Sequence, residues 1–186
     1  MRDFSDLHPS PALTRRRLLR CSAAALATVA VAPAFARMAE RRTLTFVHTH
    51  TGEKLVTSYK VGGCYQPSCL AQVNHLLRDF RTGETHPIDP PLLDLLFDLQ
   101  VLADREATFE VICGYRSPVT NAQLHRKSSG VASHSLHMQG KAIDIRISGL
   151  PTARLRDYAL SLRRGGVGYY AVSDFVHVDT GWVRFW

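Results

Sequence analysis

Two short stretches near the end of the chain carry two histidines and an aspartate in a pattern that restricts the fold. In SLHMQGKAID (residues 135–144), the carboxylate of Asp144 follows the imidazole of His137 by seven positions. In FVHVD (residues 175–179), His177 lies inside a strand-like run. These side chains can act together only if a loop, the strand that follows it and a neighbouring strand converge.

The ligand types in this pattern indicate a metal site. Two imidazoles and one carboxylate suit a zinc ion that keeps its fourth position open for water, and an open position distinguishes hydrolytic from structural zinc sites. Each residue alone is a weak signal, but the spacing around Gly140 and Ala142 is more specific, because glycine lets the chain fold back between the ligands. We therefore predict an enzyme, a zinc hydrolase, with one Zn²⁺ ion held by His137, Asp144 and His177.

The hydrophobic pattern after residue 40 predicts an α+β domain. Alternating apolar residues predict strands at 43–48, 55–60, 108–113, 142–147, 165–170 and 175–180. Helical spacing of apolar residues predicts helices at 70–80, 89–102, 121–126 and 152–163. Helices on one side and strands at the end favour a small, mainly antiparallel sheet with helices packed on it.

The first 36 residues have the pattern of an export signal. The basic stretch TRRRLLR (residues 14–20) precedes the apolar run SAAALATVAVA (residues 22–32), and AFA (residues 34–36) is a small-x-small cleavage site. Adjacent arginines before such a run are the twin-arginine export pattern, and the run is shorter than the about 20 residues of a spanning helix. We predict a twin-arginine-type signal peptide at residues 1–36, a zinc peptidase domain at residues 37–186, and a periplasmic location.

Charge and cysteine content limit the expected partners. Of the net charge of +7, much lies in the first 36 residues, and the rest of the chain holds 18 Lys and Arg against 14 Asp and Glu. With no arginine-rich helix interleaved with aromatics, we expect no nucleic-acid partner, and no stable membrane insertion after signal cleavage.

Cys64 and Cys69 can form a local disulfide or a metal pair. Cys113 lies in an apolar run and is expected to be a buried strand residue.

Three stretches together resemble a known family. They are SLHMQGKAIDIR (residues 135–146), GGVGYY (residues 165–170) and FVHVDTG (residues 175–181). The H-x-x-G-x-A-x-D motif followed by a strand histidine resembles the zinc peptidases that act on peptidoglycan, which include D-Ala-D-Ala peptidases, penicillin-insensitive murein endopeptidases and phage endolysin peptidases. The longer match resembles the murein endopeptidase K-like family over nearly all of residues 37–186.

This resemblance implies a fold and an activity. The fold is that of D-Ala-D-Ala peptidases, which hedgehog signalling domains share, and the activity is zinc-dependent hydrolysis of amide cross-links between the peptide stems of peptidoglycan. His137, Asp144 and His177 carry over as metal ligands. Arg116, in GYRS (residues 114–117), matches an arginine of the superfamily and suits binding of a substrate carboxylate or of the developing oxyanion.

Two aspartates compete for the role of general base. Many relatives in the wider superfamily place an acid three residues before the last histidine, a spacing that Asp174 meets. Alternation along a strand instead places Asp179 on the face of His177, so Asp174 reaches the site only from a turn or bulge. Asp179 can also act by orienting a ligand. Both aspartates stay candidates, with Arg116 as the third catalytic residue.

The sequence also suggests roles for four further residues and leaves two alternative functions open. His134 is expected to line the pocket or to support a ligand. The aromatic residues Trp182, Phe185 and Trp186 are suited to grip a sugar, but they are expected instead to pack the last strand onto the core. Two alternative functions stay open. The first is a D,D- or L,D-carboxypeptidase of peptidoglycan, and the second is a non-catalytic zinc-containing module that binds the cell wall.

Overall fold

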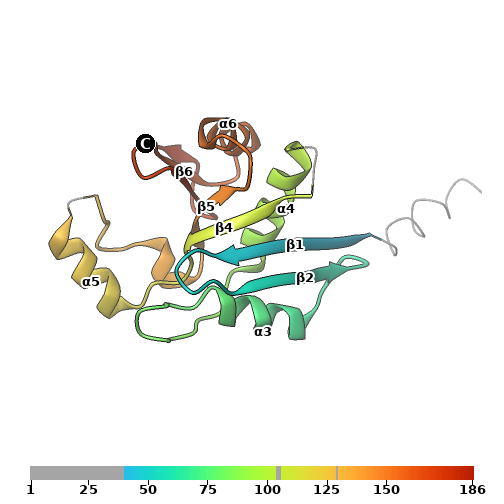
Figure 1. The fold of residues 1–186 in the computed structure, drawn as a ribbon, viewed down its shortest axis with the longest axis horizontal. Helices are drawn as coiled ribbons and strands as arrows, with labels where there is room; N and C mark the ends of the chain where they lie inside the picture. Colours follow the sequence, from blue (N-terminus) through green and yellow to red (C-terminus); the bar gives the residue numbers. More distant parts are fainter. Residues whose placement is uncertain (1–39, 104–105, 129) are drawn as a thin grey trace, which may run out of the picture. The chain divides into compact units, whose positions relative to one another are not determined.

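A mixed sheet organises residues 40–103, 106–128 and 130–186, which are the residues that this computed structural model describes (Figure 1). Its eight strands lie in the order β3-β2-β1-β4-β5-β7-β6-β8. They are β1 (Arg41–His48), β2 (Lys54–Val61), β3 (Cys64–Tyr65), β4 (Thr108–Cys113), β5 (Ala142–Ile147), β6 (Gly166–Tyr170), β7 (Phe175–Asp179) and β8 (Arg184–Phe185). β1 with β4 and β6 with β8 pair in parallel, and the other neighbours are antiparallel. The prediction of an α+β domain with a mainly antiparallel sheet is confirmed, whereas the predicted signal peptide lies outside the described residues.

Helices connect these strands. They are α3 (Pro67–Leu76), α4 (Pro90–Leu102), α5 (Pro118–Lys127), α6 (Thr152–Leu162) and the short 3-10 helix η1 (Leu136–Gln139). α3 ends earlier than predicted, because Asp79 accepts hydrogen bonds from Arg81 N and from the hydroxyl and backbone N of Ser117, which holds the chain in a turn. α5 starts earlier than predicted, since Ser117 caps it and Pro118 suits the first turn. Among the described helices, none is long and apolar enough to cross a membrane.

The two faces of the sheet carry different side chains. On β5, Ile143 and Ile145 belong to the buried core, and Asp144 between them points to the opposite face. β7 repeats this pattern, because its two valines join the core and His177 lies between them. α4 and α6 contact strands of the sheet and each other on the core side. The polar face is therefore left for the predicted metal ligands.

A β-bulge in β4 brings a cysteine to this polar face. Val111 pairs with Ile145, but Cys113 pairs with Asp144, so one extra residue lies between the two pairs. Such a bulge moves the side chains of the residues that follow it to the other face of the sheet. Cys113 is buried, as predicted, but it shares the face of Asp144 instead of the face of Val111.

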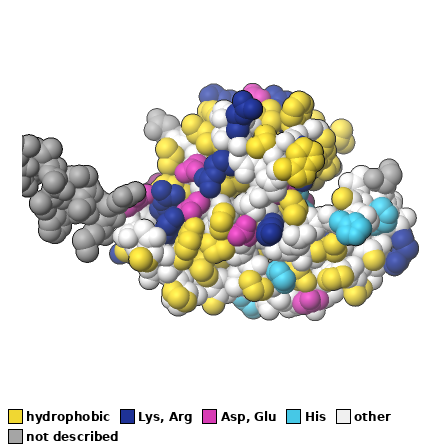
Figure 2. Space-filling model, turned by 180° about the vertical axis from the view of Figure 1, so that it is seen from behind, with side chains coloured by type: hydrophobic (Ala, Val, Ile, Leu, Met, Phe, Trp, Pro, Cys, Tyr) yellow, Lys and Arg dark blue, Asp and Glu magenta, His cyan; other side chains and the backbone are white. Residues whose placement is uncertain are grey.

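The C-terminal aromatic residues are not part of the core. The expectation that they pack the last strand onto the core is wrong, since Trp182, Phe185 and Trp186 are 75%, 79% and 51% exposed. Phe185 belongs to β8, a two-residue edge strand that pairs with the start of β6, and Trp182 and Trp186 lie before and after it. Cys64 and Cys69 are both free, so the structure lacks the local disulfide that the sequence permits. On the face shown in Figure 2, acidic and basic side chains are interspersed among hydrophobic ones.

Candidate metal centre

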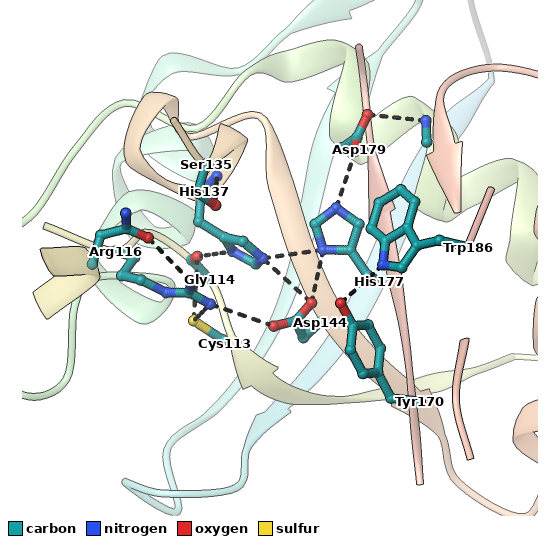
Figure 3. A network of polar contacts seen from close by, with 12 residues as sticks. Cys113, Gly114, Arg116, Ser135, His137, Asp144, Tyr170, His177, Asp179 and Trp186 are labelled. Carbon is teal, nitrogen blue, oxygen red and sulfur yellow. Dashed lines mark hydrogen bonds and ion pairs between the residues drawn. The ribbon is translucent and has the colours of Figure 1, made fainter. Parts of the chain in front are cut away.

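Three ligand atoms of the predicted metal residues converge at one point on the polar face (Figure 3). His137 Nε2 lies 3.1 Å from His177 Nδ1 and 3.3 Å from Asp144 Oδ1. His177 Nδ1 lies 2.9 Å from the same carboxylate oxygen. The pairing of β5 with β7 sets Asp144 opposite His177, and η1 supplies His137. The structure therefore brings the three residues together, and all three are buried.

Hydrogen bonds on the far side of each imidazole determine which nitrogen faces this point. His137 Nδ1 lies 2.7 Å from the carbonyl oxygen of Gly114, and since a carbonyl only accepts, Nδ1 carries the proton. His177 Nε2 lies 3.0 Å from Asp179 Oδ2 and donates to it in the same way. His137 Nε2 and His177 Nδ1 are then bare in the neutral rings. In the neutral rings, two bare nitrogens and a carboxylate oxygen thus face one another, so that only a bound proton or a cation can bridge them.

This set of atoms fits a metal ion. Bonds of 2.0–2.2 Å in a tetrahedral zinc site separate neighbouring ligand atoms by about 3.3–3.6 Å, slightly more than the separations of 2.9–3.3 Å observed here. Burial alone lowers the pKa of His137, but the charge of Asp144 outweighs it and raises that pKa to about 10. Burial raises the pKa of Asp144, but the charge of His137 more than offsets this effect. The pKa of this carboxyl group therefore lies well below its usual range. The centre therefore attracts a cation, and a metal ion would displace protons as it binds.

Cys113 is a nearby group that the sequence did not place at the site. Cys113, His137 and Asp144 each offer a ligand atom, and these atoms lie within 4.8 Å of one another. The group with His177 is tighter, because its three atoms lie within 3.3 Å of one another and both imidazoles are held by a second hydrogen bond. Cys113 Sγ instead accepts a long hydrogen bond from Arg116 at 3.6 Å. The bulge that turns it inward leaves no mark on the hydrophobic pattern.

Arg116 lies beside the three ligand atoms. Its guanidinium group approaches Asp144 Oδ2 to 3.8 Å and donates to Asn121 Oδ1 at 3.3 Å. The side chain is mostly buried and lines the pocket over the centre, and its Nε has no hydrogen-bond partner among the described residues. A buried cation with unused donor capacity is suited to an anionic group entering the pocket.

Asp179 supports His177 from behind instead of facing the pocket. It is fully buried, and its two oxygens accept hydrogen bonds from His177, from Gly166 N and Gly181 N, and from the guanidinium of Arg184. Burial raises the pKa of Asp179, but these donors, first His177 and then Arg184, hold it well below its usual range. Asp179 therefore fits the role of orienting the imidazole, one of the two roles that the sequence left open.

The structure places Asp174, the other candidate for the base, away from the three ligand atoms. Asp174 ends the β6–β7 turn with a φ of 52°, accepts a hydrogen bond from Thr152 Oγ1 at 2.7 Å and pairs with Arg146. Its side chain is 60% exposed and is not among the residues that line the pocket. The turn needed to aim it at the metal is present, but it directs the carboxylate towards α6.

A pocket of about 610 Å³ opens over the three ligand atoms. Arg116, His134, Tyr170 and Trp186 are among the residues that line it, so the expectation that His134 is a pocket residue is confirmed. Within the described lining, Asp144 is the only carboxylate. A candidate substrate can therefore reach the centre from one side, past an arginine and two aromatic side chains.

Gly140 sets the position of the His137 turn, and alanine is expected to disrupt it. Gly140 has a φ of 65°, and a Cβ would lie 2.1 Å from the carbonyl oxygen of Pro87. Gly140→Ala should lower the free energy of unfolding by about 2–4 kcal/mol, from a left-handed backbone and a backbone clash. Urea unfolding measures this loss. Gly52→Ala is the matched control, because Gly52 has a φ of 73° with nothing within 4 Å and should lose only about 1–2 kcal/mol. Equal losses in both variants would show that the contact with Pro87 is unimportant.

Comparisons with known proteins relate this chain to a peptidase family. A peptidase family model described as peptidoglycan L,D-endopeptidase MepK matches residues 36–186. A protein of Haemophilus influenzae named probable peptidoglycan L,D-endopeptidase MepK is 48% identical over 146 residues, which cover 78% of each chain. The peptidoglycan L,D-endopeptidase MepK of Escherichia coli strain K12 is 43% identical over 175 residues, which cover 92% of this chain and 96% of the relative. No solved structure matches the chain significantly.

Proposed function

Because this chain belongs to the peptidase family described as peptidoglycan L,D-endopeptidase MepK, we propose that it hydrolyses L,D amide cross-links between the peptide stems of peptidoglycan. The observation that carries this proposal is the convergence of two bare imidazole nitrogens and a carboxylate oxygen beneath an open pocket. A structural zinc site is closed by protein ligands, whereas this arrangement leaves room for a substrate.

We propose that His137, Asp144 and His177 hold one zinc ion. When bound, zinc acts as a Lewis acid that polarises a carbonyl group, and it lowers the pKa of water so that hydroxide is available for attack near neutral pH. Gly114 and Asp179 fix the orientation of the two imidazoles from behind. This arrangement keeps the ligand atoms in place before the ion arrives.

Arg116 is proposed to bind the substrate on the side of the pocket next to Asp144. Peptide stems carry carboxylates, and cleavage places negative charge on the oxygen of the scissile carbonyl. The guanidinium lines the pocket as a planar cation suited to either group, and its contact with Asn121 limits its movement. Replacement by lysine keeps the charge but not the planar pair of donors.

The proposed location follows from the substrate. A peptidoglycan endopeptidase acts on the cell wall, and we propose that this protein does so in the periplasm after export. Residues 1–36 are proposed to be the twin-arginine signal peptide, and residues 37–186 the zinc peptidase domain. The proposed partners are the peptide stems, with no nucleic acid and no stable membrane insertion after the signal is removed.

A digest of purified cross-linked muropeptide dimers tests the activity. The protein is expected to convert dimers joined by an L,D (3-3) bond to monomers, to stop when a chelator removes the metal, and to recover when zinc is returned. Mass spectrometry measures each product. Dimers joined by a D,D (4-3) bond are the matched control and should stay intact.

The other products would identify the competing functions. Loss of one terminal residue with the cross-link intact would mean a carboxypeptidase. Cleavage of the 4-3 dimer alone would keep the endopeptidase activity and overturn the L,D assignment. A protein that holds zinc but leaves every muropeptide unchanged would be a non-catalytic module that binds the cell wall.

A further inference from the structure

Tyr170 and Trp186 form a hydrogen-bonded pair at the wall of the metal pocket (Figure 3). Tyr170 lies on β6, where alternate residues share a face, and Gly168 on that face pairs with His177. Tyr170 therefore points to the side of the sheet that carries the metal ligands. Figure 3 shows its hydroxyl group directed towards the centre, across from Arg116.

The direction of the hydrogen bond determines what the hydroxyl of Tyr170 can do. Trp186 Nε1 lies 2.9 Å from Tyr170 Oη, and an indole N–H can only donate. The phenol oxygen is thus the acceptor, and its own O–H proton is left for another partner. Among the described residues, no second hydrogen bond of this hydroxyl is recorded, and the space beside it is the pocket. The hydroxyl therefore offers a donor to whatever occupies the pocket.

Packing holds both rings of the pair in place. The ring of Tyr170 stacks on Phe175, with ring centres 4.5 Å apart and planes inclined by 17°. Two backbone hydrogen bonds anchor Trp186. Its N donates to Val167 O, and its O accepts from Tyr169 N.

The indole of Trp186 also connects the pair to a metal ligand. Its ring centre lies 5.2 Å from that of His177. It rests over Gly168, where any Cβ would approach the indole to 2.7 Å, so only glycine leaves room for it. The donor is consequently in position before a substrate binds, which is the condition under which such donors contribute most to catalysis.

We propose that Tyr170 is a catalytic residue that donates a hydrogen bond to the oxygen of the scissile carbonyl as negative charge develops on it. Trp186 is the positioning residue that orients this hydroxyl through its indole N–H. This inference rests on the proposed amide hydrolysis. Arg116 and Tyr170 would then approach the reacting group from opposite sides of the pocket, so that the oxygen and a substrate carboxylate each have a donor.

Three single substitutions test this role in the purified full-length protein. Tyr170→Phe removes only the hydroxyl, and Trp186→Phe keeps an aromatic ring but removes the N–H. Tyr169→Phe is the matched control, because Tyr169 lies on the opposite face of β6, packs against the core and carries Arg156 over its ring. Each variant is assayed for kcat and KM on the 3-3 muropeptide dimer and for bound zinc. The affinity for a phosphinate analogue, in which a tetrahedral –P(O)(O⁻)–CH₂– group replaces the scissile amide, is also measured.

Tyr170→Phe is expected to lower kcat by roughly 10²–10³-fold, the usual effect of losing one oxyanion donor, and to leave KM and bound zinc nearly unchanged. Affinity for the phosphinate should fall with kcat/KM, because both report stabilisation of the tetrahedral oxygen. Trp186→Phe should show a smaller loss of the same kind. Tyr169→Phe should match the unchanged protein in every measurement.

Three results would overturn the proposal. They are an unchanged kcat in Tyr170→Phe, a rise in KM alone, or a loss of zinc that accounts for the lost activity. Phosphinate binding needs no turnover, so it separates this proposal from the proposed function. If the unchanged protein cuts no dimer, the proposed function fails. Even then, equal phosphinate affinity in Tyr170→Phe and the unchanged protein would be enough to reject the proposed hydrogen bond from Tyr170 to the tetrahedral oxygen.

Discussion

Replacement of His137 by alanine is expected to remove the bound metal and to lower kcat/KM by at least about 10³-fold. A Lewis acid contributes several kcal/mol to the stabilisation of the transition state, and each 1.36 kcal/mol is a factor of ten in rate. Losing one of the three proposed ligands leaves only His177 and Asp144 to hold the ion. Metal analysis after dialysis and the muropeptide digest measure the two effects.

A matched histidine separates this effect from general damage. His75 on α3 has a side chain 66% exposed, and it is absent from the lining of the metal pocket. His75→Ala should therefore retain metal and activity. His137→Ala should keep its circular dichroism spectrum, because the core lies on the opposite face of the sheet. A His137→Ala protein with full activity would refute the ligand assignment.

Replacement of Asp179 by alanine is expected to damage both stability and metal binding. The carboxylate is fully buried and accepts hydrogen bonds from Arg184, from His177 and from two backbone N–H groups. Removing one partner of a buried charge pair costs about 3–5 kcal/mol, since the other groups lose their partner. Metal affinity should fall about 10–100-fold as His177 loses its orientation. Urea unfolding and zinc titration measure these two losses.

Asp174→Asn is the control for the competing assignment. Asparagine tolerates the left-handed backbone of this position, and Asp174 is exposed, so the change in stability should stay within about 0.5 kcal/mol. Activity should be unchanged. If Asp174→Asn were inactive while Asp179→Ala stayed active, the base would be the residue three positions before His177, and the roles assigned here would be reversed.

Several features of the site follow from local sequence. The ligand types and their spacing are visible directly, and strand alternation puts Asp179 on the face of His177 because side-chain direction has a period of two residues. The turn at Gly140 is also local, since it needs only a left-handed backbone. These predictions depend on neighbours in the chain, and for this reason they hold without knowledge of the tertiary structure.

Other features depend on contacts between distant segments. Asp174 met the expected spacing, but its contacts with Thr152 and Arg146 hold it away from the pocket. The bulge that turns Cys113 towards Asp144 arises from the register between β4 and β5, which the hydrophobic pattern does not encode. The aromatic residues expected in the core are exposed, because β8 pairs only at the edge of the sheet.

The amino-acid sequence specifies which chemical groups this protein has and the order in which they occur. Their roles depend on the folded structure, because hydrogen bonds across the fold fix the direction and the protonation of each group. Gly114 and Asp179 select the nitrogen that each imidazole presents, and Trp186 leaves the hydroxyl of Tyr170 as a donor to the pocket. Those partners lie 23, 2 and 16 positions away in the chain, so even the nearest of them acts only once the strands and turns have aligned the groups.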